Sequence, residues 1–354
     1  VGGEAAIPGV NRVIKLSSNE GALGPSPAAI EAYRREATAI HRYPDGAAVA
    51  LREAIAAAWR LDAARILCGA GSDDLLCLLA QAYGGPGTET IVTRHAFAMY
   101  PIYARYAGSK VVTVEERDLT ADVDLILGAV SPRTSLVFLA NPNNPTGTFL
   151  PWSEILRLRK GLPEHVLLVL DLAYAEYLDD PAVPEVIGLI EASPNTVMTR
   201  TFSKIYGLGG LRLGWAYGPR QIIDVLDRVR SPFNASRPAQ AAAIAALGDH
   251  DHFQASRVHN RRLRAWLTEA LESTGVAVRG SEGNFVLADF AAVGRSADAA
   301  DRVLRSRGII VRRLANYGLP GMLRITIGTE DEMEALAEAT AQFMQQLDRA
   351  GSHG

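Results

Sequence analysis

The sequence has few lysines and cysteines, little net charge and no long apolar run, and each shortage argues against a class of protein. There are only two cysteines in 354 residues, so we expect no framework of disulfides. A formal net charge of -3 gives no electrostatic support for binding nucleic acid. Charges, glycines or prolines interrupt every apolar stretch well before the roughly 20 residues that a bilayer span needs. We therefore expect a cytoplasmic protein with neither nucleic-acid nor membrane partners.

Lysine is much scarcer than arginine in this chain. It occurs only at Lys15, Lys110, Lys160 and Lys204. Genomic base composition accounts for most of this bias. A chain that uses arginine so readily must still keep lysine wherever an amine has to lose its proton and attack a carbonyl, because guanidinium stays charged. Few positions can therefore supply a nucleophilic amine.

Short apolar runs alternate with helical patterns from about Ile66 to Tyr217. Runs this apolar predict strands that are buried on both faces, and the helices between them predict a mostly parallel sheet covered by helices. In such sheets, ligands bind beyond the carboxyl ends of the strands. The predicted strands are residues 91–93, 111–114, 136–139, 166–170, 197–199 and 215–217, and the predicted helices are residues 73–83, 97–107 and 153–160.

The sequence changes character after Pro238. An Ala-rich helix is followed by an Arg-rich helix from about His252 to Ser273, and then by short strands mixed with helices. A prior of roughly 150 residues per domain suggests about two domains for this length. We predict an α/β fold in which residues 41–235 form a large domain with a mostly parallel sheet. Residues 1–40 and 236–354 are predicted to form a smaller α+β domain.

The most informative cluster of reactive side chains lies in residues 201–212, which follow a predicted strand. Two hydroxyls, Thr201 and Ser203, stand with Lys204 and Arg212 around a glycine-rich turn. Hydroxyls and arginine suit a phosphate group, and a lysine beside them suits an imine with a pyridoxal aldehyde. Taken alone, the match also allows a surface lysine and a solvated arginine.

Three further turns follow predicted strands. Residues 141–147, with the sequence NPNNPTG, close one strand, and a turn of this composition can be purely structural. Asp171 ends another strand, with Tyr174 shortly after it; a buried carboxylate needs a partner, either a protonated pyridine nitrogen or a structural salt bridge. Residues 67–74 run through glycines into a helix whose free N–H groups can hold a phosphate. Phe97, taken by itself, is typical of a core residue.

Together these segments resemble the fold-type I aminotransferases, and specifically the histidinol-phosphate aminotransferase family. The resemblance runs from residues 16–20 (LSSNE) and 42–46 (RYPDG) through the Asn-Pro turn and the Ser-Lys motif to residues 323–329 (LRITIGT). The Asn-Pro-Thr-Gly turn, the Asp-x-x-Tyr motif and the Ser-Lys motif with its trailing arginine are highly specific as an ordered set. One departure is Leu172, where many relatives carry glutamate.

The resemblance implies how the chain would hold pyridoxal 5'-phosphate. Lys204 is implied to be the Schiff-base lysine and proton shuttle, and Asp171 to pair with the pyridine nitrogen. Asn144 and Tyr174 are implied to hold the ring hydroxyl, with Phe97 stacked on the ring. The residues implied to bind the cofactor phosphate are Ser72, Asp73, Thr201, Ser203 and Arg212.

The resemblance also implies a partner subunit and a substrate site. Tyr43 would reach the phosphate of the neighbouring subunit, which predicts a homodimer. Arg324 would grip the substrate α-carboxylate bidentately, and Arg312, Asn284 and Asn19 are candidates for contacts with the substrate.

The implied activity is transamination from histidinol phosphate, the amino donor, to 2-oxoglutarate in histidine biosynthesis. An aromatic amino acid aminotransferase acting on Phe or Tyr remains an alternative, because the same architecture accepts both. A pyridoxal-phosphate decarboxylase of a phosphorylated amino acid is a second alternative. A cofactor-binding regulatory module fused to a DNA-binding domain is a third, and the absence of a basic helix-turn-helix-like extension argues against it.

Overall fold

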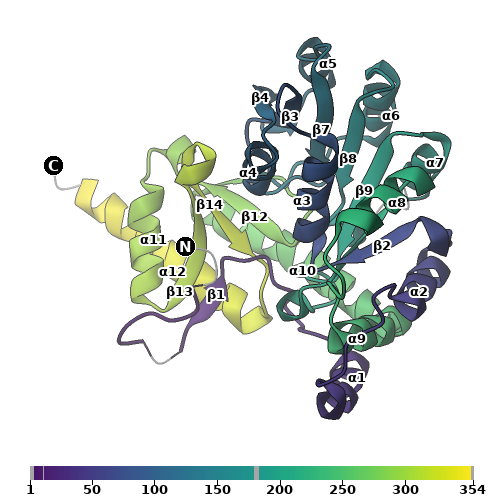
Figure 1. Ribbon diagram of the computed structural model, residues 1–354. Coiled ribbons are helices and arrows are strands. Elements are labelled where there is room, and N and C mark those ends of the chain that lie inside the picture. The colour runs from purple at the N-terminus through teal and green to yellow at the C-terminus, as the bar shows by residue number, and fades with distance from the viewer. Residues whose placement is uncertain (1–3, 11, 179–182, 352–354) are drawn as a thin grey trace.

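The larger of two helix-covered sheets has seven strands. The computed structural model describes residues 4–10, 12–178 and 183–351 (Figure 1). All strands of this sheet run parallel except β10, which is antiparallel to both its neighbours. In spatial order the strands are β2 (Ile66–Gly69), β10 (Gly214–Tyr217), β9 (Thr196–Thr201), β8 (Leu167–Asp171), β7 (Thr134–Ala140), β3 (Glu89–Thr93) and β4 (Lys110–Val114).

Helices cover both faces of this sheet, as the alternation of apolar runs and helical patterns predicts. The fold is that of the predicted α/β class, and its central strands are buried along their whole length. Most predicted boundaries differ from the observed ones by one or two residues; Phe97, for example, precedes its helix, which begins at Met99. The helices are α3 (Ser72–Tyr83), α4 (Met99–Tyr106), α5 (Val123–Gly128), α6 (Trp152–Gly161), α7 (Val183–Ala192) and α8 (Arg220–Val229).

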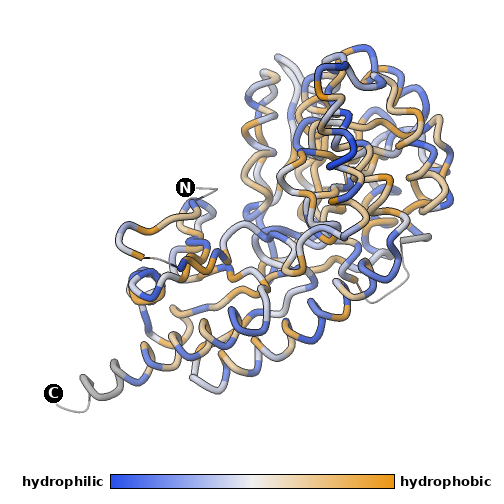
Figure 2. The backbone as a smooth tube through the Cα atoms, turned by 90° about the horizontal axis from the view of Figure 1, so that it is seen from below, coloured by the Kyte–Doolittle hydropathy of each residue, from blue (hydrophilic) through white to orange (hydrophobic). Residues whose placement is uncertain are grey.

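The smaller sheet has five strands and a core of its own. Ile325 of the sheet and Leu267 and Leu336 of the helices that cover it belong to one buried apolar cluster. Figure 2 shows hydrophilic and hydrophobic residues alternating along the helix that ends near the C-terminus, as expected for a helix with one buried face. The strands are β1 (Ile14–Leu16), β13 (Ile309–Leu314), β14 (Leu319–Thr326), β12 (Phe285–Asp289) and β11 (Ala277–Arg279), and the helices are α10 (His250–Ser273), α11 (Ala297–Ser306) and α12 (Glu330–Gly351).

The N-terminal segment contacts both parts of the molecule. Strand β1 pairs in parallel with β13 of the smaller sheet. Helix α1 (Pro27–Glu36) instead lies against α9 (Arg237–Gly248) and near α2 (Val49–Trp59), beside the larger sheet (Figure 1). Buried alanines of α1 and α9 belong to the same apolar cluster as β8 and β10. The division into residues 41–235 and the remainder stays a prediction, and this packing favours placing α1 and α9 with the larger domain.

A short hairpin, β5 (Glu116–Arg117) and β6 (Thr120–Ala121), follows β4. Within the described part of the chain, no helix has both the length and the apolar character to cross a membrane.

The strands β7, β8 and β9 end side by side, so the polar residues that follow them are brought to one edge of the sheet.

Candidate active site

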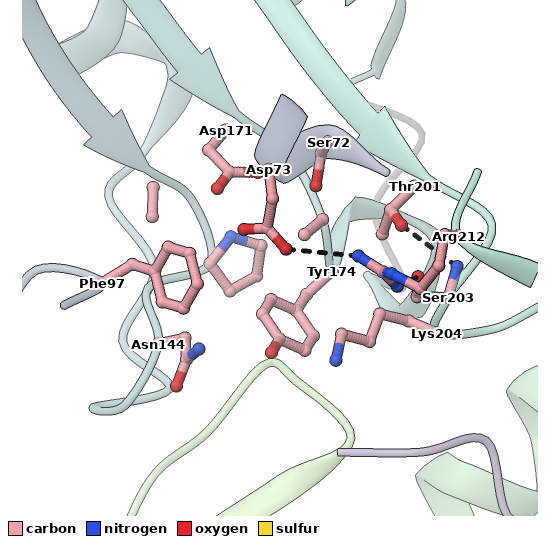
Figure 3. Close-up of a pocket in the computed structure, with 13 residues that line it drawn as sticks. Ser72, Asp73, Phe97, Asn144, Asp171, Tyr174, Thr201, Ser203, Lys204 and Arg212 are labelled. Carbon is pink, nitrogen blue, oxygen red and sulfur yellow. Dashed lines mark hydrogen bonds and ion pairs between the residues drawn. The ribbon is translucent and has the colours of Figure 1, made fainter. Parts of the chain in front are cut away.

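A cavity opens at the carboxyl ends of β7, β8 and β9, beside the N-terminus of α3. It lies where ligands bind in sheets of this kind. Figure 3 shows its lining side chains converging from separate segments of the chain. The predicted residues that line it are Ser72, Asp73, Phe97, Asn144, Asp171, Tyr174, Thr201, Ser203, Lys204 and Arg212.

One end of the cavity is built to receive an anion. Helix α3 begins there, and the first N–H groups of a helix lack intrahelical partners. Arg212 reaches the same place, donating to Gly209 O at 2.9 Å and Ser203 Oγ at 3.3 Å. Gly71 has a φ of +88°, which other residues rarely adopt, and a Cβ there would lie 2.6 Å from Arg212 Nη2 and displace the guanidinium. This end of the cavity is therefore suited to a phosphate.

Lys204 faces the cavity with its amine 5.7 Å from the centre of the Tyr174 ring (Figure 3). Its Nζ donates to Ser18 O at 3.3 Å. Burial, followed by the positive charge of Arg324, lowers the pKa of this amine to about 8. Roughly a tenth of the amine is therefore unprotonated at pH 7, far more than for an ordinary lysine, as a nucleophile and proton carrier requires.

Asp171 is a buried carboxylate whose hydrogen bonds come from neutral groups. Tyr100 Oη donates to its Oδ2 at 2.7 Å, and Thr199 Oγ1 lies 3.4 Å from its Oδ1. Burial raises its pKa to about 6, although the Tyr100 hydrogen bond works in the opposite direction. Among the residues that the structure describes, none forms an ion pair with Asp171. The carboxylate is thus available to a cationic group in the cavity.

The Asn-Pro turn combines structural and exposed polar groups. Asn141 exchanges two hydrogen bonds with the backbone of Leu150, and Asn143 donates to His95 O. These two side chains hold the turn, as the structural reading of its sequence expects. Asn144 instead lines the cavity, where its Oδ1 accepts a hydrogen bond from Arg324 Nη1.

Arg324 lies against the cavity wall without lining it. Its Nη2 donates to Ser17 O at 2.8 Å, and its Nε has no hydrogen-bond partner among the described residues. Arg312 is its direct neighbour across strands β13 and β14 and is partly exposed beside a second hollow that includes Ser17 and Asn316. The two arginines are therefore directly opposite each other on paired strands, and Arg324 is the one beside the site.

Asn19 and Asn284 brace the site from outside the cavity. Asn19 Nδ2 donates to Tyr174 Oη at 2.9 Å, which fixes the phenol. Asn284 Nδ2 donates to the backbone oxygens of Asn19 and Glu20, both at 3.1 Å. Both asparagines are buried. Their side-chain amides donate hydrogen bonds to other groups of the protein, although both residues were predicted to contact a substrate. Their assignment to substrate binding stays a prediction.

Tyr43 lies outside the cavity of its own chain. It is 79% exposed and stacks on Phe233 with ring centres 4.7 Å apart. Its role in a neighbouring subunit stays a prediction.

Tyr100 is a residue that sequence reasoning missed. It is completely buried, stacks on Phe138 and touches the edge of Phe97. Its hydroxyl orients Asp171, so one side chain supports both the carboxylate and the aromatic ring predicted to stack on a cofactor. In the sequence, Tyr100 is one of several apolar residues of a helix, and only the tertiary contact reveals its role.

We expect Tyr100→Phe to lower kcat about tenfold with KM nearly unchanged, because one hydrogen bond to a charged group is lost while the ring packing stays. Steady-state kinetics on the purified variant measures this. Tyr106→Phe, on the same helix and 72% exposed, is the matched control and should behave as wild type. A normal kcat in Tyr100→Phe would contradict the role given to Tyr100.

The fold and the site together are those of the fold-type I aminotransferases. The family model described as "Aminotransferase class I and II" matches residues 11–339, and the chain belongs to this family.

Two of the most similar proteins are histidinol-phosphate aminotransferases. That of Granulibacter bethesdensis is 57% identical over 346 residues, 98% of this chain and 93% of the relative. That of Rhodospirillum rubrum is 56% identical over 345 residues, 97% of this chain and 94% of the relative. These matches extend along nearly the whole of both partners.

Solved structures share the fold. The histidinol-phosphate aminotransferase of Sinorhizobium meliloti in complex with pyridoxal-5'-phosphate has a TM-score of 0.88 and 32% identity, covering 95% of this chain and 91% of that one. The aspartate aminotransferase of Thermus thermophilus with maleate has a TM-score of 0.81 and 27% identity, covering 94% and 91%. The fold therefore hosts aminotransferases with different substrates, so the fold alone does not identify the amino donor.

Proposed function

We propose that this chain is a pyridoxal-phosphate-dependent aminotransferase that acts on histidinol phosphate in histidine biosynthesis. The observation that carries the chemistry is the convergence of three groups on one cavity: the Lys204 amine, the Asp171 carboxylate and the anion site around Arg212. The near full-length similarity to histidinol-phosphate aminotransferases supports the choice of substrate.

The residues of the cavity fit pyridoxal 5'-phosphate. The anion site around Gly71 and Arg212 suits its phosphate, and Asp171 lacks the cation that a protonated pyridine nitrogen would provide. Phe97 and Ala173 stand among the lining residues where a flat ring needs apolar surface. Asn144 and Tyr174 supply polar groups for a ring hydroxyl.

When bound, pyridoxal phosphate supplies an electron sink for the negative charge left on a substrate carbon that has lost its proton. Lys204 Nζ takes that proton and returns it, and its pKa of about 8 allows both directions near neutral pH. Asp171 would pair with a positive charge at the far end of the cavity. This pairing matters most when negative charge develops on the substrate carbon. Asn19 keeps the Tyr174 hydroxyl in place.

Arg324 and its strand neighbour Arg312 are the positive groups that would bind the negatively charged substrates. Histidinol phosphate carries no α-carboxylate, so Arg324 would hold its phosphate, and in the second half-reaction a carboxylate of 2-oxoglutarate. A planar fork of five donors permits this dual use. Arg312 lies next to it and has no hydrogen-bond or ion-pair partner among the described residues, so it is available as the second cation.

Removing Arg312 tests the substrate. We expect Arg312→Ala to lower kcat/KM for histidinol phosphate about 10- to 100-fold, because a charge-assisted contact to a phosphate is lost. Phenylalanine and tyrosine should lose much less, since they carry a single carboxylate. Initial rates with 2-oxoglutarate for the three donors give the comparison. Preference of the wild type for phenylalanine or tyrosine would make the aromatic alternative correct, and equal losses would remove Arg312 from phosphate recognition.

We also propose that the enzyme is a homodimer in which Tyr43 of one protomer completes the site of its partner. Exposed apolar side chains, including Tyr33, Ile40, Tyr43 and Phe233, surround a hollow on this face. A patch of this kind favours contact with another protein surface. A second copy of the chain is the partner that the proposed role of Tyr43 requires.

Mixed dimers test this assignment. Tyr43→Phe should weaken cofactor binding about tenfold, because a hydrogen bond to a phosphate is lost. Co-refolding it with Lys204→Ala should restore one site of normal affinity, since that site combines an intact Lys204 with an intact Tyr43 from the other chain. Cofactor titration of the separated heterodimer measures this. A fully active monomer in sedimentation, or no recovery on mixing, would exclude the shared site.

A further inference from the structure

Beneath the active site, on the other face of β9, lies a buried ion pair that the proposed mechanism does not use. Arg200 and Glu176 have side chains that are 0% and 2% exposed, with Arg200 Nη2 2.8 Å and Nε 3.1 Å from Glu176 Oε1. The guanidinium lies 3.7 Å from the centre of the Trp59 ring and 5.4 Å from that of Trp215. It is therefore enclosed by a carboxylate and two indoles.

Stability alone gives a weak account of this arrangement. Burying two charges removes their hydration, and replacing such a pair by apolar side chains is often neutral or stabilising. Only Nε of Arg200 makes a hydrogen bond to Glu176, while Nη1 and Nη2 have no hydrogen-bond partner among the described residues; burial also raises the pKa of Glu176. The pair is therefore a weak source of stability, and a geometric role is the better explanation.

The cluster contacts the chain on both sides of the reactive lysine. Arg200 is on β9, four residues before Lys204. Tyr206, two residues after Lys204, is buried close to Trp59. Alternation along the strand turns Thr199 toward Asp171 and Arg200 away from it.

The cluster also contacts the turn that carries Tyr174, through Glu176. Glu176 lies in the short 3-10 helix Ala175–Tyr177, directly after Tyr174 and Ala175. The pair thus ties the turn after β8 to the end of β9. These are the segments that present Tyr174 and Lys204 to the cavity.

We propose that Arg200 and Glu176 are positioning residues that hold Lys204 and Tyr174 in register with each other. They touch neither substrate nor cofactor and act through the backbone of the two turns. This inference rests on the proposed function for its effect on rate, but the placement of Lys204 can be measured without it.

The test replaces the pair by an apolar one, Arg200→Met with Glu176→Leu, which keeps the volume and removes both charges. We expect the double variant to fold, with kcat lowered about 10- to 100-fold and KM changed less than about twofold, because a small misplacement of a reacting group is costly. A merely structural pair would move the melting temperature and leave kcat as it is.

A second readout uses the cofactor-free full-length protein. Carbamylation by cyanate, followed by peptide mass spectrometry over a pH series, reports the acidity of each of the four lysines. In wild type, Lys204 should titrate near its pKa of about 8. In the double variant we expect this pKa to rise by about one unit as the amine becomes better hydrated, while Lys110 and Lys160 stay unchanged.

Glu89 provides the matched control. It is a buried carboxylate paired with Arg133 at 2.7 Å and accepting from Ser131 at 2.6 Å, at the opposite edge of the same sheet from the cavity. Glu89→Gln should lower the melting temperature and leave both kcat and the labelling of Lys204 unchanged. A loss of kcat in this variant equal to that of the double variant would overturn the positioning role.

Glu176→Asp keeps both charges but shortens the acidic side chain by one methylene, which draws its carboxylate away from Arg200. This variant serves if the double variant does not fold. We expect a smaller change in the same direction in both readouts. Wild-type kcat and an unshifted Lys204 titration, in whichever variant folds, would overturn the proposal. A wild type without aminotransferase activity would refute the proposed function alone, because the labelling experiment still reports whether the pair positions Lys204.

Discussion

Lys204→Ala should abolish transamination, with kcat lowered by more than about 10⁴-fold, because the covalent anchor and the proton carrier are lost together. The wild type should be yellow as purified. The substitution removes only one side chain from the cavity wall, so the anion site around Arg212 should still bind cofactor reversibly. Single-turnover kinetics and the visible spectrum of the variant measure the two effects.

Because the chain has only four lysines, the residue that binds the cofactor covalently can be identified directly. Borohydride reduction of the wild type followed by peptide mass spectrometry should place the cofactor on Lys204. Lys15 pairs with Glu20 and Lys110 with Glu89, and neither lines the cavity. Lys160→Ala is the control, because Lys160 is an exposed residue of α6, and it should retain full activity. An adduct on Lys15, Lys110 or Lys160 would show that the site has been misassigned.

Asp171→Ala should lower kcat about 10²- to 10³-fold while the substrate KM changes little. The carboxylate acts on charge that develops in the transition state, so its removal costs rate more than ground-state binding. Asp171→Asn should lose nearly as much, because it keeps the shape and discards the charge. Steady-state kinetics at saturating cofactor separates this effect from weaker cofactor binding.

The pH dependence of the cofactor-free protein provides a check on Asp171. Its pKa of about 6 lies above the usual value because burial disfavours the charged form. Cofactor binding should therefore weaken as the pH falls through 6, when the carboxylate takes up a proton and can no longer pair with a cation. Asp171→Asn should lack this step, and a wild-type binding curve without it would argue against the pairing. Near-normal turnover in Asp171→Ala would refute the role altogether.

The fold class and the cofactor were predictable because each depends on local patterns. Apolar runs of strand length between helical patterns define a sheet that is covered on both faces, and the turn after each strand is then directed to one edge. The segments around Asn144, Asp171 and Lys204 carry their chemistry in short motifs, so their order along the chain was enough to indicate the family. The helix start near Phe97 was misplaced by two residues, as is common for element ends.

The sequence by itself determined the alternation of strands and helices, the single reactive lysine motif and the residues that surround it. Only the tertiary structure decided which distant groups meet. Tyr100 reaches Asp171 across 71 positions, Asn19 fixes Tyr174 across 155, and Asn284 supports the loop of Asn19 across 265. The same holds for Arg200 between Trp59 and Trp215. Such contacts follow from how sheets and helices pack, and the spacing of residues along one chain carries no record of them.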